Sequence, residues 1–214
     1  MFGQVGERRE MEIGAYILTA LFAYLLGSIP TGYVLARLRG NANLLQQGSG
    51  RTGATNVLRT MGWKVAAQVF AGDFLKGVLA ILMARLMTGS DPTADLVAGL
   101  AALMGHNYSV FIGFKGGRGV TTGLGALAVI SPIVMAVTTI IGVAIIARSR
   151  YVSLGSVLGS GTVPISMLIV VMLLGQPFPH FLFGLLGAAF VIVSHRDNIQ
   201  RLLRGTERKL GQRA

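Results

Sequence analysis

Three short segments of the chain concentrate glycine, hydroxyl, amide and basic side chains between long apolar stretches. They are residues 48–59 (GSGRTGATNVLR), 105–119 (GHNYSVFIGFKGGRG) and 194–210 (SHRDNIQRLLRGTERKL). Glycine allows the backbone to approach a ligand closely, and the cationic groups of Arg and Lys bind phosphate oxygens. Residues of these types predict a site that binds and positions a phosphorylated ligand.

The first segment combines side-chain donors with a cation. Ser49, Thr55 and Asn56 can donate hydrogen bonds, and Arg59 offers a planar guanidinium group that fits phosphate oxygens. A polar loop that caps a helix would have a similar composition. Composition alone therefore leaves a functional and a purely structural interpretation open.

The second segment places two glycines between two cations, as Lys115, Gly116, Gly117 and Arg118. Successive backbone N–H groups in such a turn can form a nest that binds an anion. We expect the next helix to begin here, so the positive end of its dipole would face the same ligand. The alternative is a basic loop that only contacts lipid headgroups. We expect His106, which precedes the loop, to cap the helix before it.

The third segment places His195 and Asn198 three residues apart, which puts both side chains on one face of a helix. An amphipathic tail lying on an anionic leaflet is the alternative. A Ser–His–Asp triad with Ser49 is disfavoured, because Asp197 adjoins His195 and would project elsewhere on a helix. The chain has no cysteine, which excludes thiol nucleophiles, and its three histidines are far apart, which disfavours a metal site.

Apolar stretches make up most of the remaining sequence. The chain of 214 residues is 52% hydrophobic and 13% charged, whereas soluble domains are about 25% charged. Long apolar runs are typical of helices in lipid. We therefore predict an all-α integral membrane protein whose residues 1–214 form a single polytopic domain. The runs cover residues 13–29, 65–87, 96–104, 120–147, 151–174 and 181–194.

The distribution of basic residues predicts the orientation in the membrane, because basic loops stay in the cytoplasm. The loop 88–95 carries acids and no cation, so we expect it and the short N-terminus 1–12 to lie outside. This bias also explains the net charge of +11 without nucleic-acid binding. The basic segments expected in the cytoplasm are 31–64, 105–118, 148–150 and the C-terminal tail 195–214.

The same orientation constrains the number of helices. Run 120–147 is longer than the roughly 20 residues that cross a bilayer, and Pro132 lies near its middle. Proline interrupts helices and disfavours a helical backbone at the preceding residue. Two short helices meeting near Pro132 would return the chain to the cytoplasm before Arg148. We therefore predict about seven helical segments, some short or broken, with the N-terminus outside and the C-terminus cytoplasmic. Five full spans with re-entrant pieces is the alternative.

Charged residues inside run 65–87 need partners, because a lone charge at mid-bilayer costs roughly 2.5–3.5 kcal/mol. Asp73 and Lys76 are three residues apart, so we expect them to pair on one helix face. We expect Arg85 to extend outward to the headgroups. Residues 27–33 (GSIPTGY) predict a structural break at the end of the first helix.

The three polar segments together resemble the signature segments of the bacterial membrane glycerol-3-phosphate acyltransferases that use acyl-phosphate as donor. The similarity is carried by GSGRTGATNVLR, GHNYSVFIGFKGGRGV and HRDNIQRLLRGTE, in that order, and it extends over residues 27–207. The resemblance implies transfer of a fatty acyl group from acyl-phosphate to the 1-position of sn-glycerol 3-phosphate. The implied products are lysophosphatidate and inorganic phosphate, in an early step of phospholipid synthesis.

The resemblance also implies roles for individual residues. Ser49 and Arg59 resemble the essential serine and arginine of the first segment, and Glu207 resembles the structural acid of the third. The second segment resembles a phosphate-binding loop. We assign catalysis to Ser49, His195 and Asn198, and phosphate binding to Thr55, Asn56, Arg59, Lys115, Gly116, Gly117 and Arg118.

Two residues depart from the family pattern. Arg51 stands where the family usually has Asn, and Arg118 stands where it usually has a second Lys. Arg118 keeps the positive charge, whereas Arg51 changes the local hydrogen bonding. Neither substitution changes the reaction that the resemblance implies.

An acyl-phosphate is a mixed anhydride and is already activated, so we expect no cofactor and no metal ion. Cations and N–H groups can bring two anions together and orient the glycerol hydroxyl for direct attack on the acyl carbonyl. The base is either His195, whose ordinary pKa is near 6.5, or a phosphate oxygen of the donor. An acyl intermediate on Ser49 is a third route. The His-x-x-x-x-Asp motif of many other acyltransferases is absent, which disfavours acyl-CoA as donor.

A membrane transporter of organic phosphates is the alternative function. An inverted repeat or a ladder of cations deep in the spans would favour it, and the sequence shows neither. A non-catalytic lipid-binding scaffold would not need three polar segments on one side. The resemblance implies an enzyme of the bacterial inner (plasma) membrane whose active site faces the cytoplasm. Its implied partners are acyl-phosphate, glycerol 3-phosphate, membrane lipids and the enzyme that makes acyl-phosphate.

Overall fold

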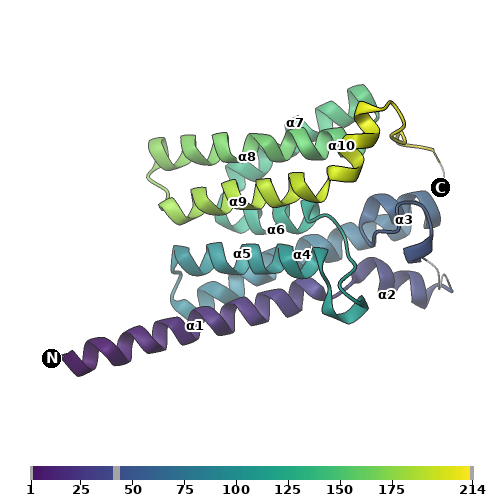
Figure 1. Ribbon diagram of the computed structural model, residues 1–214. Coiled ribbons are helices and arrows are strands. Elements are labelled where there is room, and N and C mark those ends of the chain that lie inside the picture. The colour runs from purple at the N-terminus through teal and green to yellow at the C-terminus, as the bar shows by residue number, and fades with distance from the viewer. Residues whose placement is uncertain (1, 41–43, 213–214) are drawn as a thin grey trace.

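The apolar runs all form helices that pack side by side in one bundle (Figure 1). The computed structural model describes the chain over residues 2–40 and 44–212, with side chains from residue 11 onward; residues 1, 41–43 and 213–214 of the predicted single domain lie outside this description. The long helices are α1 (Phe2–Ser28), α4 (Trp63–Thr88), α5 (Pro92–Asn107), α6 (Val120–Ile130), α7 (Pro132–Ser149), α8 (Val152–Leu174) and α9 (Phe178–Ser194).

Shorter helices gather at the end of the bundle where the C-terminus lies (Figure 1). They belong to the polar and basic segments, not to the apolar runs. These elements are α2 (Thr31–Leu38), α3 (Ala54–Met61), α10 (Arg196–Leu203) and two single 3-10 turns, η1 (Leu44–Gln46) and η2 (Val110–Ile112).

Both predicted helix breaks are confirmed. Helix α6 ends at Ile130 and α7 begins at Pro132, with Ser131 between them in an extended conformation (φ −152°, ψ 88°). Proline occupies the first position of α7, where its missing N–H has no intrahelical acceptor. The GSIPTGY segment likewise ends α1 at Ser28 and starts α2 at Thr31. Local sequence was sufficient to locate both breaks, because each one is caused by a proline.

Small residues let the helices approach closely. Helix α6 lies between α7, α8 and α9 on one side and α1, α4 and α5 on the other (Figure 1). A Cβ added to Gly77 of α4 would lie 2.0 Å from the Thr122 carbonyl oxygen of α6, and one added to Gly125 would lie 2.0 Å from the Phe74 carbonyl oxygen. Only glycine fits at these two positions, so they fix the crossing of α4 and α6.

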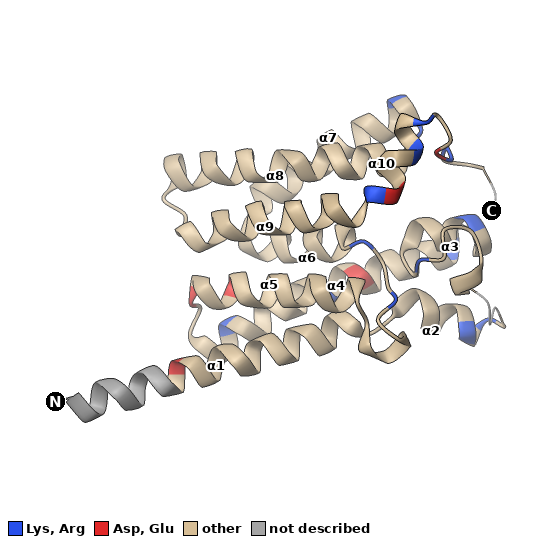
Figure 2. Cartoon of the chain, viewed as in Figure 1, with Lys and Arg blue, Asp and Glu red and all other residues tan. Residues whose placement is uncertain are grey.

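Within residues 2–40 and 44–212, four helical stretches are long and apolar enough to cross a membrane. The pair α9 and α10, bent by 59° at His195, provides a fifth candidate, whereas α6 is an apolar helix of only 11 residues. Figure 2 shows most Lys and Arg residues at the end of the bundle that carries α2, α3 and α10. The four stretches are Met11–Leu38, Trp63–Thr88, Pro132–Ser149 and Val152–Leu174.

The predicted ion pair inside α4 is confirmed. The Lys76 Nζ lies 2.7 Å from the Asp73 Oδ1, and both side chains are buried. Lys76 also donates to the Ile29 carbonyl oxygen at 2.7 Å and to the Gly27 carbonyl oxygen at 3.4 Å. The ammonium group therefore satisfies carbonyls that the break between α1 and α2 leaves without helical partners.

The outward extension expected for Arg85 is wrong. Its guanidinium group binds both carboxylate oxygens of Asp95. The Arg85 Nε lies 3.3 Å from Oδ1 and 3.1 Å from Oδ2, and the Nη2 lies 2.8 Å from Oδ2. Asp95 lies in α5, is 1% exposed and also contacts the His180 Nε2 at 3.2 Å. Because α4 and α5 are joined by a short turn, they bring Arg85 opposite a buried carboxylate, and the pairing holds the cation inside the bundle.

We predict that the Asp73–Lys76 pair stabilises the bundle. Lys76→Met would leave the Asp73 carboxylate buried without its cation, and removing one partner of a buried pair costs about 3–5 kcal/mol. The melting temperature in detergent, followed by circular dichroism, should fall clearly for Lys76→Met and recover in part when Asp73→Asn is added. Lys64→Met, at an exposed position of the same helix, should change it little. An unchanged melting temperature in Lys76→Met would contradict the prediction.

Candidate active site

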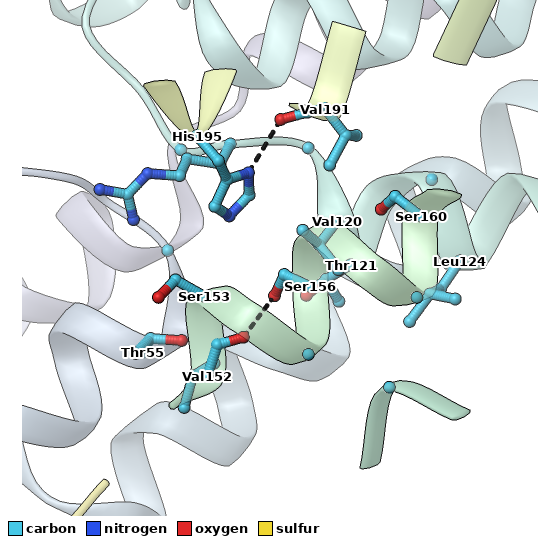
Figure 3. A pocket seen from close by; sticks show the side chains of 18 of the residues that line it. Thr55, Val120, Thr121, Leu124, Val152, Ser153, Ser156, Ser160, Val191 and His195 are labelled. Carbon is cyan, nitrogen blue, oxygen red and sulfur yellow. Dashed lines mark hydrogen bonds between the residues drawn. The ribbon is translucent and has the colours of Figure 1, made fainter. Parts of the chain in front are cut away.

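The three polar segments meet at one cavity of about 340 Å³. Its polar end lies where the short helices gather, and Figure 3 shows His195 across the cavity from Thr55 and Ser153. Segments separated by more than a hundred residues thus contribute to one site. The predicted site residues that line the cavity are Ser49, Thr55, Asn56, Arg59, Gly117, Arg118, His195 and Asn198, and Glu207 joins them.

Lys115 and Gly116 are not among the residues that line the cavity. Lys115 is exposed and pairs through its backbone with Ser109. Gly116 is buried, and its carbonyl oxygen accepts from the Thr52 N–H at 3.5 Å. In this conformation both residues shape the loop, and their assignment to phosphate binding remains a prediction.

The first segment is organised around the side chain of Asn56, which is 2% exposed. Its Oδ1 accepts from the Ser49 N–H at 2.9 Å, and its Nδ2 donates to the carbonyl oxygens of Arg51 at 2.9 Å and Gln47 at 3.2 Å. The amide of Asn56 is thus engaged with the backbone of the turn before α3. This geometry makes Asn56 the residue that positions Ser49 at the cavity.

Arg59 connects the first segment to the third. It lies in the last turn of α3, and its Nη2 donates to the Arg208 carbonyl oxygen at 3.2 Å. Burial lowers the pKa of Arg59, and the nearby Glu207 carboxylate acts in the opposite direction. The group remains a cation at neutral pH, so it presents positive charge to the cavity.

Arg118 presents a second cation from the loop before α6. Its Nε is buried and has no hydrogen-bond partner among the described residues. Burial, followed by the positive charge of Arg51, lowers the pKa of Arg118 to about 10. Arg118 is therefore still charged at neutral pH, and a buried N–H group without an acceptor favours binding of an anion here.

His195 lies at the junction of α9 and α10 and is 3% exposed. Its Nδ1 lies 2.8 Å from the Val191 carbonyl oxygen, as Figure 3 shows. Because a carbonyl oxygen only accepts, the proton sits on Nδ1 and the lone pair on Nε2. Burial lowers the pKa of His195 to about 4, and the charges of Arg118 and Arg51 act in the same direction. The ring is thus neutral at pH 7 and able to accept a proton.

Glu207 organises the third segment. Its Oε1 accepts from the Ser153 hydroxyl at 2.8 Å and from the Asn198 Nδ2 at 2.7 Å, and its Oε2 accepts from the Arg201 Nε at 2.7 Å. Burial raises the pKa of Glu207, but these hydrogen bonds outweigh it and lower the pKa overall. Asn198 is left with a buried Oδ1 that has no donor among the described residues. That oxygen is an acceptor available to a substrate hydroxyl.

The described residues do not form the Ser–His–Asp triad. Asp197 is an exposed residue whose Oδ1 lies 3.8 Å from the Arg196 Nε, and the His195 Nδ1 is occupied by Val191. Within the described ranges, no group of three His, Cys, Asp or Glu residues is arranged to hold a metal ion.

The expectation that His106 caps its helix is wrong. Its side chain is buried inside the bundle, with Nδ1 3.7 Å from the Asp73 Oδ1. Its backbone carbonyl accepts from the Gly117 N–H at 3.0 Å, and a Cβ added to Gly117 would lie 1.9 Å from its Nε2. His106 therefore packs against the loop of the second segment at Gly117. Sequence alone gave no signal for this contact, because Asp73 lies in another helix.

Away from its polar end, the cavity continues between apolar side chains of α6, α7, α8 and α9, which include Leu124, Val143, Val163 and Phe183. Glycines make room for it: a Cβ on Gly155 of α8 would lie 2.5 Å from the Gly142 carbonyl oxygen of α7. The cavity is thus cationic at one end and apolar along its length, as a ligand with a phosphate and an acyl chain requires. The class of protein is therefore a helical membrane protein whose cavity combines a cationic end with an apolar arm.

Comparison with known proteins identifies the family. Residues 17–205 match the glycerol-3-phosphate acyltransferase family. The chain is 42% identical over 197 residues to the glycerol-3-phosphate acyltransferase of Thermoanaerobacter sp. (strain X514), covering 92% of this chain and 96% of that protein. It is 44% identical over 207 residues to that of Clostridioides difficile (strain 630), covering 95% and 99%.

Solved structures give the same result. The fold resembles a crystal structure of PlsY, an integral membrane glycerol 3-phosphate acyltransferase in its glycerol 3-phosphate form, with a TM-score of 0.83, 41% identity and coverage of 92% of this chain and 96% of that one. A lysophosphatidic acid form of PlsY gives a TM-score of 0.81, 40% identity and coverage of 92% and 95%. The chain belongs to the glycerol-3-phosphate acyltransferase family, and it is an integral membrane enzyme.

We predict that the contact between Gly117 and His106 is required for activity. In Gly117→Ala the added Cβ would overlap the His106 Nε2, so the loop must shift, and a displacement of about 1 Å at a site can reduce the rate about a hundredfold. Acyl transfer to glycerol 3-phosphate should show this fall in kcat/KM. Gly161→Ala, where an added Cβ meets no atom within 4 Å, is the matched control and should keep wild-type kinetics. Wild-type kinetics in Gly117→Ala would refute the contact's importance.

Proposed function

We propose that this enzyme transfers a fatty acyl group from acyl-phosphate to the 1-hydroxyl of sn-glycerol 3-phosphate, giving lysophosphatidate and inorganic phosphate. The observation that carries the proposal is the single cavity in which the cationic end, built from all three polar segments, continues into an apolar arm. The PlsY structures with glycerol 3-phosphate and with lysophosphatidic acid support the acceptor and the product. The choice of acyl-phosphate as donor rests on the signature segments and on the absence of a His-x-x-x-x-Asp motif.

The reaction is a direct displacement at the acyl carbonyl. The glycerol oxygen forms a bond to the carbonyl carbon while the bond from that carbon to the phosphate oxygen breaks. The hydroxyl proton passes to a base, and the electron pair of the broken bond leaves with the phosphate. The donor is already activated, so positioning and charge stabilisation by cations suffice, without a cofactor or a metal ion.

The contacts among the site residues support distinct roles for them. Arg59, Arg118 and Thr55, which line the cavity, hold phosphate oxygens. Phosphate binding by Lys115, Gly116 and Gly117 would require a different loop conformation, because Lys115 and Gly116 do not line the cavity and the Gly117 N–H donates to the His106 carbonyl oxygen. Ser49, which Asn56 holds at the cavity, and the free Oδ1 of Asn198 orient the acceptor hydroxyls. The two segments thus fix the acceptor from opposite sides, as a near-attack geometry requires.

His195 is the base in this mechanism, and the donor phosphate is the alternative. The Nδ1–H tautomer leaves Nε2 free to accept the hydroxyl proton. The cavity also receives charge from two phosphate groups, which counteract the cations that lower the pKa of the ring. Bound substrates therefore raise the basicity of His195 in the complex relative to the empty enzyme.

The active site faces the cytoplasm in this proposal, with the N-terminus outside and the C-terminus inside the plasma membrane. The basic residues gather at the end of the bundle that contains the polar end of the cavity, in keeping with the positive-inside rule (Figure 2). Phosphorylated substrates then enter from the compartment in which they are made. The enzyme that supplies acyl-phosphate would act on the same side of the membrane.

We predict donor specificity in a direct assay. Purified protein in detergent receives labelled glycerol 3-phosphate and either palmitoyl-phosphate or palmitoyl-CoA, with a metal chelator present. Labelled lysophosphatidate should form with palmitoyl-phosphate alone. Product from both donors would keep the reaction but overturn the donor specificity. Folded protein that binds glycerol 3-phosphate and forms no product with palmitoyl-phosphate would refute the proposed reaction.

We predict that His195→Gln lowers kcat by about 10²–10⁴-fold, the usual contribution of a general base. The affinity for glycerol 3-phosphate, measured by calorimetry without a donor, should stay near that of the wild type. Retained turnover combined with weaker acceptor binding would overturn the role as base and favour the donor phosphate. The glycine control Gly161→Ala serves here also as a check on protein quality.

A further inference from the structure

Arg51 is a third arginine that lines the cavity, and the mechanism described above gives it no role. Arg51, Arg59 and Arg118 all contribute to its wall. Among the described residues, none of these three guanidinium groups forms an ion pair with a carboxylate. Within the described part of the protein, the positive charge at this end of the cavity is only partly offset, by the Glu207 charge that acts on Arg59 and Arg118.

The acids of the cavity are committed elsewhere. Glu207 accepts hydrogen bonds from Ser153, Asn198 and Arg201, and Asp73 pairs with Lys76. Neither carboxylate forms a direct ion pair with Arg51, Arg59 or Arg118. Like charges gathered in a partly buried site repel one another, so a bound anion would stabilise this arrangement.

Arg51 is close enough to act on the other groups of the site. Its charge lowers the pKa of both Arg118 and His195. Its backbone is fixed, because its carbonyl oxygen accepts from the Asn56 Nδ2 at 2.9 Å and the next residue, Thr52, donates to the Gly116 carbonyl oxygen. The turn that carries Arg51 is therefore attached to the loop that carries Arg118.

The position of Arg118 indicates whether Arg51 and Arg118 would bind the phosphate of the acyl donor or that of glycerol 3-phosphate. The next helix, α6, begins at Val120, and α6 lines the apolar arm with Val120, Leu124 and Leu127. An anion beside Arg118 would thus lie at the entrance of the arm that accommodates an acyl chain. Arg59, by contrast, is attached to the C-terminal segment through the Arg208 carbonyl oxygen.

We propose that Arg51 and Arg118 together form the subsite for the phosphate of the acyl donor, and for inorganic phosphate after transfer, separate from the site of the glycerol 3-phosphate phosphate at Arg59. This assignment rests on the proposed function. The leaving phosphate gains negative charge as its bond to the acyl carbon breaks, so two cations at this place stabilise the leaving group as well as the bound donor.

The test compares Arg51→Asn and Arg51→Lys with Arg204→Asn, an exposed arginine at the end of α10 that does not line the cavity. Initial rates are measured over a matrix of palmitoyl-phosphate and glycerol 3-phosphate concentrations. Arg51→Asn should lower kcat/KM for palmitoyl-phosphate about ten- to hundredfold, the equivalent of one charge-assisted contact, with the KM for glycerol 3-phosphate near the wild-type value. Arg51→Lys should recover part of the loss, and Arg204→Asn should match the wild type.

A binding experiment separates this proposal from the proposed function. Inorganic phosphate is titrated by calorimetry into protein saturated with glycerol 3-phosphate, with no acyl donor present. Phosphate should bind the wild type and Arg204→Asn alike, and Arg51→Asn about tenfold or more weakly. Equal phosphate affinity in Arg51→Asn, or a rise in the KM for glycerol 3-phosphate in place of the donor effect, would overturn the subsite. Failure of wild-type turnover with palmitoyl-phosphate would refute the reaction, while the titration would still decide the role of Arg51.

Discussion

The buried pair of Asp73 and Lys76 is the interaction on which the geometry of the site depends. Lys76 holds the carbonyls at the break between α1 and α2, and Asp73 lies next to the His106 ring, which supports Gly117. Neither charge is tolerable alone in apolar surroundings, so the two must remain together. The pair thereby stabilises the break between α1 and α2. Through His106 it also helps to position the loop that carries Gly117 and Arg118.

Charges in this protein fall into two groups with different purposes. At the end of the bundle away from the cavity mouth, Arg85 is bound by both oxygens of Asp95, which joins α4 to α5. At the cavity, Arg118 has a buried Nε without an acceptor, and Asn198 has a buried Oδ1 without a donor. Buried polar atoms without a partner among the described residues also occur away from the cavity, for example at Ser131 and at the Nδ1 of His180. An unpaired buried group therefore points to the site only where its residue also lines the cavity, as Arg118 and Asn198 do.

The sequence was sufficient for features that depend on neighbouring residues. Apolar runs gave the long helices, Pro132 gave the division between α6 and α7, and the spacing of three residues gave the Asp73–Lys76 pair. The distribution of basic residues predicted that the three polar segments lie on the same face of the membrane. The sequence failed for Arg85 and His106, whose partners lie in adjacent helices and are set by packing, and it missed the apolar arm made by facing glycines. The orientation of Lys115 away from the cavity depends on loop conformation, which composition does not determine.

The chemistry of His195 follows from the same balance of charge. Burial is the main reason that its pKa is about 4, and the neighbouring arginines add to the effect. A neutral ring avoids placing another positive charge beside Arg118. Under the proposed reaction, two phosphate groups offset the arginines, so the imidazole becomes a stronger base only when both substrates are bound. In the proposed mechanism, the charges of the arginines and of the bound substrates together set the basicity of His195.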